Sequence, residues 1–137
     1  MAEKKIKILV IDDDPDFVRA TGMVLESAGY DVVAAFSGSE GLEKSGSEKP
    51  DLYIIDLMME TYSEGSKVVK VLCSDKETIG KPRIMITSVD LSGPWDSYPS
   101  DDWLPCDFLV QKPVTPDDLL NYVKRALESK QALSEDA

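Results

Sequence analysis

The chain has 137 residues and a formal net charge of −11, from 26 Asp and Glu against 15 Lys and Arg. This length fits one ordinary globular domain, and 42% hydrophobic residues are too many for a disordered acidic tail. The chain has no histidine, which excludes Ser–His–Asp and Cys–His catalysis and any phosphohistidine on this chain. It also lacks the clustered Lys and Arg that direct nucleic-acid binding requires.

The cysteines and the N-terminus indicate where the protein works. Cys73 and Cys106 form no CxxC pair, which favours reduced thiols over a disulfide. The apolar run over residues 6–11 is too short for a signal peptide or a membrane span. We therefore expect a cytoplasmic protein that does not insert into a membrane.

The first apolar run predicts a strand and the segment after it predicts a helix. Residues 6–11 are almost continuously apolar, as in a strand covered on both faces of a parallel sheet. Three aspartates follow directly, and the third, Asp14, suits a helix N-cap with Pro15 at the first helical position. Phe17 begins the apolar face of this helix, and Gly29 is expected to end it.

The rest of the chain repeats this alternation within a single domain over residues 1–137. Further strands are predicted over residues 31–35, 51–55, 83–86 and 108–110, and further helices over residues 37–47, through 67–72 and from 115 onward. Between the last two strands, three prolines in residues 92–105 make a regular fourth helix improbable, so we expect an irregular or shortened one. The core is expected over about residues 5–128, with a solvated tail over 129–137. Five strands alternating with helices predict an α/β protein with a doubly wound parallel sheet and helices on both faces.

Polar residues stand where four of the predicted strands end. Asp12 and Asp13 follow the first strand, Asp56 the third, Thr87 the fourth and Lys112 the fifth. Because ligands bind at the carboxyl ends of parallel strands, we expect these side chains to gather at one edge. Three adjacent carboxylates repel one another and need a cation, for which oxygen ligands favour Mg²⁺. With a lysine and a hydroxyl nearby, such a cluster suits the receipt of a phosphoryl group on a carboxylate.

The same segments resemble the response regulator receiver domains of two-component signalling. The resemblance is carried by residues 7–15, 50–59, 84–88 and 112–113, in that order and each at a predicted strand end. It covers roughly residues 5–128. It implies a flavodoxin-like sheet with strand order 2-1-3-4-5.

The resemblance also implies a phosphoacceptor and its metal ligands. Asp56 would take a phosphoryl group from the phosphohistidine of a sensor histidine kinase or a histidine phosphotransfer protein. Asp13 would bind Mg²⁺ directly, together with the acceptor Asp56 itself. Asp12 would help to hold the ion through water, and the backbone carbonyl of Met58 would complete the protein ligands.

Two further residues would bind the phosphoryl group, and one of them would couple this binding to a conformational change. Lys112 would pair with the acceptor carboxylate and then with the phosphoryl oxygens. Thr87 would hydrogen-bond the phosphoryl group and pull its loop along, which would switch a surface for a downstream protein. The Lys112–Pro113 bond is expected to be cis, as the matching bond of the family usually is.

Three departures from the family pattern concern this transmission. Glu60 stands where a proline commonly follows the acceptor strand. The aromatic switch residue is expected three positions before Lys112, where this chain has Leu109, and its aromatic, Phe108, lies one residue earlier. Either the strand carries an extra residue, or the coupling between the threonine and the aromatic is lost. Residues 92–105 also replace much of the fourth helix, which is normally part of the output face.

Three functions compete on the sequence. The first is a stand-alone phosphoacceptor that is not itself an enzyme, with its output in another molecule because no DNA-binding module follows Ala137. The second is a Mg²⁺-dependent phosphatase of the haloacid dehalogenase type, whose Asp-x-Asp motif Asp12 and Asp14 could mimic; Asp16 departs from that motif. The third is a receiver-like docking module that no longer switches.

Overall fold

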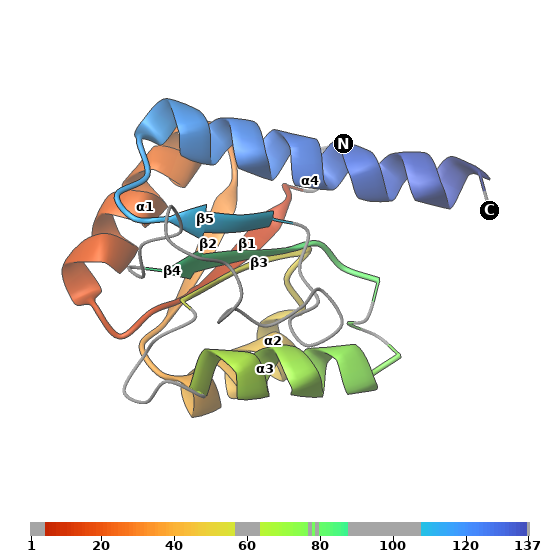
Figure 1. Ribbon diagram of the computed structural model, residues 1–137, viewed down its shortest axis with the longest axis horizontal. Coiled ribbons are helices and arrows are strands. Elements are labelled where there is room, and N and C mark those ends of the chain that lie inside the picture. The colour runs from red at the N-terminus through yellow and green to blue at the C-terminus, as the bar shows by residue number, and fades with distance from the viewer. Residues whose placement is uncertain (1–4, 57–63, 77, 79, 88–107, 137) are drawn as a thin grey trace, which may run out of the picture.

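The computed structural model describes residues 5–56, 64–76, 78, 80–87 and 108–136. These residues form one five-stranded sheet and four helices around it (Figure 1). In chain order the elements are β1 (Lys7–Ile11), α1 (Pro15–Ser27), β2 (Asp31–Ala35), α2 (Gly38–Glu48), β3 (Leu52–Asp56), α3 (Glu64–Ser74), β4 (Arg83–Thr87), β5 (Phe108–Gln111) and α4 (Pro116–Asp136).

All strand pairs of the sheet are parallel, and the strand order is β2-β1-β3-β4-β5. This order confirms the flavodoxin-like fold that the resemblance to receiver domains implied. Every residue of β3 and β4 is buried, which explains why residues 52–55 and 84–86 are continuously apolar. The strand bounds differ from the predicted ones by one residue at five of the ten ends, because hydrogen bonding sets the bounds and hydropathy only approximates them.

Helices cover both faces of the sheet, as predicted. Figure 1 shows α1 and α4 on one face and α2 and α3 on the other. Alternate residues of each central strand therefore enter two separate hydrophobic clusters: Ile54 and Ile84 face α1 and α4, whereas Tyr53 and Met85 face α2 and α3. Both clusters therefore include residues of the same sheet.

The helix starts follow the predicted capping residues. Asp14 is the N-cap of α1, and its carboxylate accepts hydrogen bonds from the backbone N–H groups of Asp16 and Phe17. Gly29 follows the end of α1 with a φ of 97°, a left-handed conformation that glycine adopts without strain. The Thr115 hydroxyl accepts from the N–H of Asp118 at the start of α4.

The C-terminal segment is helical, and the solvation of residues 129–137 stays a prediction. Helix α4 runs through Asp136, whereas we expected the folded part to end near residue 128 and a tail to follow. The helix continues because Lys130, Gln131, Ala132 and Leu133 all have high helix propensity. The predicted irregular fourth helix falls within residues 88–107 and lies outside the described residues.

Candidate functional site

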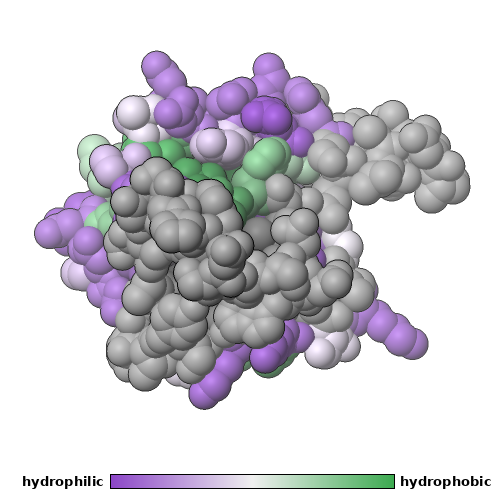
Figure 2. All heavy atoms as spheres, in the orientation of Figure 1, coloured by the Kyte–Doolittle hydropathy of each residue, from purple (hydrophilic) through white to green (hydrophobic). Residues whose placement is uncertain are grey.

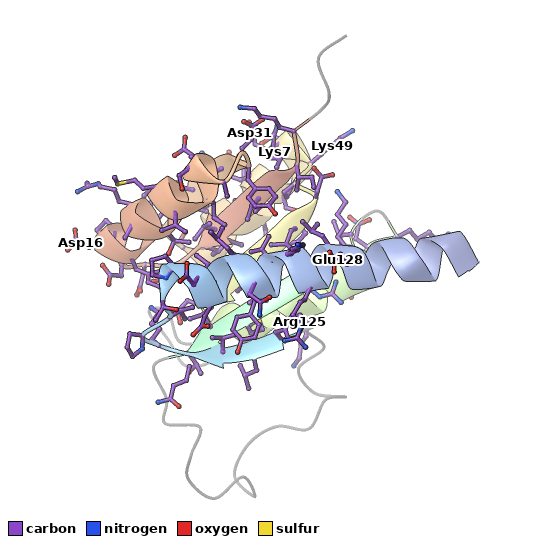
Figure 3. The ribbon with its side chains drawn as sticks, turned by 90° about the horizontal axis from the view of Figure 1, so that it is seen from above. Lys7, Asp16, Asp31, Lys49, Arg125 and Glu128 are labelled. Carbon is purple, nitrogen blue, oxygen red and sulfur yellow. The ribbon has the colours of Figure 1, made fainter. Side chains whose placement is uncertain are left out.

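The polar residues predicted at the strand ends lie at one edge of the sheet. Asp12 directly follows β1, Asp56 and Thr87 are the last residues of β3 and β4, and Lys112 directly follows β5. In Figure 3, Asp16 at the start of α1 lies at one end of the molecule. Lys7 and Asp31, the first residues of β1 and β2, lie well away from Asp16, toward the other end of α1 (Figure 3). The carboxyl ends of the strands therefore share one end of the domain with the start of α1.

Three carboxylates meet at this edge. Asp12, Asp13 and Asp56 each offer an oxygen, and these atoms all lie within 4.8 Å of one another. We call these three residues the carboxylate cluster. Asp12 and Asp56 are buried, whereas Asp13 is exposed. Like charges held this close, two of them out of water, repel one another strongly.

Lys112 is a cation that faces the carboxylate cluster. Its Nζ lies 2.9 Å from Asp12 Oδ2 and 3.9 Å from Asp56 Oδ2. The side chain of Lys112 is 21% exposed, so much of its charge is removed from solvent. The resemblance predicted pairing with the acceptor Asp56, whereas the shorter contact is to Asp12.

Both carboxylate oxygens of Asp12 are engaged. Oδ1 accepts the backbone N–H of Asp14 at 2.9 Å, and Oδ2 accepts from Lys112 Nζ. The backbone N–H of Asp12 donates to the carbonyl of Ala35 on the edge strand β2. Asp12 is therefore held in place from three directions, and Asp13 next to it is the more open carboxylate.

Thr87 is fully buried at the end of β4. In the register of β3 and β4, Asp56 pairs with Ile86, so Thr87 lies one position beyond the partner of Asp56. The carbonyl of Thr87 accepts the backbone N–H of Lys112 at 2.7 Å, which ties the ends of β4 and β5 together. The Lys112–Pro113 bond is cis, as predicted. Met58, the remaining predicted site residue, lies outside the described residues.

The register of β5 distinguishes the two explanations for the displaced aromatic: an extra residue in the strand, or loss of the coupling between the threonine and the aromatic. The four residue pairs from Ile84–Phe108 to Thr87–Gln111 are consecutive, so the described strand β5 carries no extra residue. Phe108 packs on the α1 and α4 face, against Tyr122 with ring centroids 5.3 Å apart. Thr87 belongs to the alternate set of positions, which points to the other face. Phe108 and Thr87 therefore lie on opposite faces of the sheet, and Phe108 cannot be the aromatic partner of Thr87.

The sequence pattern missed the position of Phe17 next to the site. Hydrophobic periodicity explained this residue as part of the apolar face of α1, and its ring does pack against that cluster. The Lys112 Nζ also lies 4.2 Å from the centroid of the ring. The available signal was an aromatic in the first helical turn after the acidic run, which does not by itself indicate a contact with a lysine almost a hundred residues away.

Phe17 also lines a shallow groove between α1 and the start of α4. The groove has a volume of about 230 Å³ and its walls include Val24, Val114 and Leu119. Figure 2 shows apolar residues at the surface beneath the first half of α4. Phe17 therefore both lines the groove and contacts the Lys112 ammonium group.

The donor set of the carboxylate cluster fits a hard divalent cation. All three residues offer carboxylate oxygens, which Mg²⁺ prefers, and their spacing allows one ion to contact more than one of them. Asp13 is exposed and Asp12 is already engaged on both oxygens. Asp13 is thus the most accessible of the three carboxylates.

Comparison with known proteins places this chain in a family. The family model for the response regulator receiver domain matches residues 8–94, well over half of the chain. The chain therefore belongs to the response regulator receiver domain family, whose members are signalling modules of two-component systems.

Relatives and solved structures agree with this assignment. The chain is 40% identical over 84 residues to the alkaline phosphatase synthesis transcriptional regulatory protein PhoP of Bacillus subtilis, covering 61% of this chain and 34% of PhoP. It is 32% identical over 84 residues to the protein PilH of Pseudomonas aeruginosa, covering 61% of this chain and 69% of PilH. A CheY-like receiver domain structure from Methanospirillum hungatei superimposes with a TM-score of 0.81 at 28% identity, covering 94% of this chain and 98% of that one. The chain thus spans about a third of the length of PhoP.

Among the described residues, no helix is both long and apolar enough to cross a membrane.

Proposed function

We propose that Asp56 is the phosphoacceptor of this receiver domain. The observation that carries the proposal is a buried carboxylate at a strand end, with two further carboxylates within 4.8 Å and an ammonium group 3.9 Å away. The proposed donor of the phosphoryl group is a partner histidine kinase or histidine phosphotransfer protein, in keeping with membership of the receiver domain family.

The transfer is a displacement at phosphorus. An oxygen of the Asp56 carboxylate attacks the phosphorus of a phosphoimidazole, the new O–P bond forms as the P–N bond breaks, and the released imidazole nitrogen takes up a proton. Asp56 acts in this step as the carboxylate, and the Lys112 ammonium group 3.9 Å away offsets its charge. Lys112 is placed to stabilise the negative charge on the phosphoryl oxygens as they arrive.

The proposed cofactor is Mg²⁺, held by Asp13 and Asp56 directly and by Asp12 through water. The backbone carbonyl of Met58 is the fourth proposed ligand. When bound, the ion offsets the charge of the carboxylates and of the incoming phosphoryl group. The two engaged oxygens of Asp12 support its indirect role.

Thr87 is the proposed reader of the phosphoryl group. It ends the strand next to the acceptor strand, and its carbonyl is bonded to the backbone of Lys112. A shift of Thr87 toward a phosphoryl group would therefore also act on the segment that carries Lys112. We propose that this movement alters a surface for a downstream protein, and that it does not pass through Phe108.

The chain is proposed to act as a cytoplasmic regulator and not as an enzyme on other substrates. The phosphatase alternative requires both acids of the Asp-x-Asp pattern in the reaction. Asp14 instead caps α1 with its carboxylate, and Asp12 is held by Lys112. No observation favours the docking module that does not switch.

The test is covalent labelling by a small phosphodonor. The protein is incubated with Mg²⁺ and acetyl phosphate, and the intact mass is followed with time. One phosphoryl group per chain is expected, which an Asp56→Asn substitution or removal of Mg²⁺ by EDTA abolishes.

A matched control lies at the other end of the same strand. Asp51 precedes β3 and accepts the backbone N–H of Lys7, so an Asp51→Asn substitution removes a charge from the same segment far from the site. This variant is expected to be labelled like the wild type. Labelling that survives Asp56→Asn would overturn the proposal. Sustained hydrolysis of phosphate esters that Asp12→Asn abolishes would instead favour a phosphatase.

A further inference from the structure

Among the described residues, the Lys112 ammonium group has three neighbours of two different kinds. Two are carboxylates, with Nζ 2.9 Å from Asp12 and 3.9 Å from Asp56. The third is the face of the Phe17 ring, with Nζ 4.2 Å from its centroid. A cation within about 6 Å of an aromatic centroid is attracted by the negative face of the ring. The ring is thus a partner of Lys112 that carries no net charge.

The position of the Phe17 ring is fixed by its own surroundings. Phe17 is the third residue of α1, and its backbone N–H donates to the carboxylate of the N-cap Asp14 at 3.4 Å. The ring also packs against the hydrophobic cluster beneath α1 and α4. Because the helix cap and the core packing already hold Phe17, its ring does not lose further conformational entropy when the phosphoryl group is transferred.

We propose that Phe17 is a positioning residue that holds the Lys112 ammonium group next to Asp56 before the phosphoryl group arrives. The inference rests on the proposed role of Asp56 as the phosphoacceptor. A lysine side chain has four rotatable bonds, and immobilising it costs conformational entropy. Because the ring and Asp12 confine Nζ in advance, less of this cost falls on the transfer step.

An aromatic ring suits this role better than another acid. A further carboxylate would attract Lys112 more strongly, but it would also repel the incoming phosphoryl group and the carboxylate cluster. The ring attracts the ammonium group and adds no negative charge. It also covers one side of Nζ with apolar surface, which reduces the screening of its charge by water.

The first experiment tests the contact itself by NMR. Protons above an aromatic face are shielded by its ring current, so the ε-methylene protons of Lys112 should resonate upfield of the other lysines. The upfield shift is expected to disappear in Phe17→Leu and to remain in Phe17→Tyr. This measurement requires no phosphorylation, so it stands even if labelling of Asp56 fails.

The second experiment tests the consequence for phosphoryl transfer. The rate of Asp56 labelling by acetyl phosphate with Mg²⁺ should fall about two- to fivefold in Phe17→Leu, which is the range expected for loss of one cation–π contact. Phe17→Tyr should restore the wild-type rate because it keeps the aromatic face.

Val24→Ala is the matched control for packing. Val24 lines the same groove and packs against the same cluster, so its truncation weakens packing without touching Lys112. It should leave both the Lys112 resonance and the labelling rate unchanged. The proposal is overturned if wild-type Lys112 shows no upfield shift, if Phe17→Leu is labelled at the wild-type rate, or if Val24→Ala slows labelling as much as Phe17→Leu. A wild type that is not labelled at Asp56 would refute the proposed function, whatever the NMR result.

Discussion

Lys112 and Asp12 are 100 residues apart in the sequence and form an ion pair of 2.9 Å at the end of the sheet. Asp12 is buried, and it lies within the carboxylate cluster with Asp13 and Asp56. Lys112 is therefore the cation that offsets the repulsion within this cluster when no metal ion is bound.

Lys112→Met should destabilise the metal-free protein. Removing the ammonium group leaves Asp12 without its ion partner among like charges, which we expect to lower the free energy of unfolding by about 2 kcal/mol. Mg²⁺ should restore much of this loss, because an ion that binds only the folded state stabilises it. Urea unfolding in EDTA and in Mg²⁺ measures both effects.

Asp13→Asn is the contrasting variant for that experiment. Because Asp13 is exposed, the metal-free stability of the Asp13→Asn variant should stay within about 0.5 kcal/mol of the wild type. The stabilisation of this variant by Mg²⁺ should be smaller. Equal stability of Lys112→Met and wild type in EDTA would contradict this account of the ion pair.

Tyr53 should make the protein less stable at alkaline pH. Burial raises the pKa of its hydroxyl above the ordinary value of 10.0, only partly opposed by its hydrogen bond with Ser45 at 2.6 Å. The neutral hydroxyl is favoured in the folded state, so this contribution to stability is complete below pH 10. It is lost as the pH rises from 10 through the higher folded-state pKa, by at most about 1.4 kcal/mol per pH unit. Urea unfolding at pH 9 and pH 11 measures the loss.

Two variants separate the hydroxyl of Tyr53 from its partner. Tyr53→Phe should lose less stability between pH 9 and pH 11 than the wild type, because it has no hydroxyl to ionise. Ser45→Ala should lower stability by about 1 kcal/mol at every pH and keep the alkaline loss. Identical pH dependence in Tyr53→Phe and wild type would show that this hydroxyl does not contribute.

Gly41→Ala should destabilise the domain through a clash with β1. A Cβ at this position of α2 would lie 2.5 Å from Ile11 Cδ1 and 2.9 Å from Ile11 Cγ1. Forcing these atoms apart is expected to cost about 1–3 kcal/mol despite the better helix propensity of alanine. Thermal unfolding measures the difference.

Gly46 provides the matched control in the same helix. A Cβ there meets nothing within 4 Å, so Gly46→Ala should stabilise the domain by about 0.5–1 kcal/mol. Ile11→Val removes the Cδ1 atom and should reduce the cost of Gly41→Ala, which a double-mutant cycle detects as non-additivity. Additive effects would refute the clash.

Phe108→Leu should affect stability and leave phosphorylation unchanged. The Phe108 ring packs against Tyr122 in a tilted arrangement, with ring centroids 5.3 Å apart. Its centroid lies 5.1 Å from the Arg125 guanidinium carbon, on the face of the sheet opposite to Thr87. Its loss should cost about 1 kcal/mol and should not be additive with Tyr122→Leu. The rate of Asp56 labelling and the lifetime of the label should match the wild type. A changed lifetime in Phe108→Leu alone would assign this aromatic to the switch after all.

Much of the fold was predictable because parallel sheets have strict rules. Continuous apolar runs such as residues 52–55 read as buried strands, and the alternation with helices left few topologies. The end of α4 was not predictable from composition. Residues 129–136 are polar enough for a solvated tail, yet their helix propensity extends a helix that packing has already nucleated.

The sequence by itself determined that Asp12, Asp13, Asp56, Thr87 and Lys112 would share one edge of the sheet. Each follows or ends a strand, and parallel strands bring their carboxyl ends together whatever the side chains are. Only the tertiary structure decided how these residues pair. Lys112 lies nearer to Asp12 than to Asp56, Phe17 contributes its ring to the site, and Phe108 faces away from Thr87. Such choices depend on differences of about an ångström and on the register of β5, which local sequence patterns do not encode.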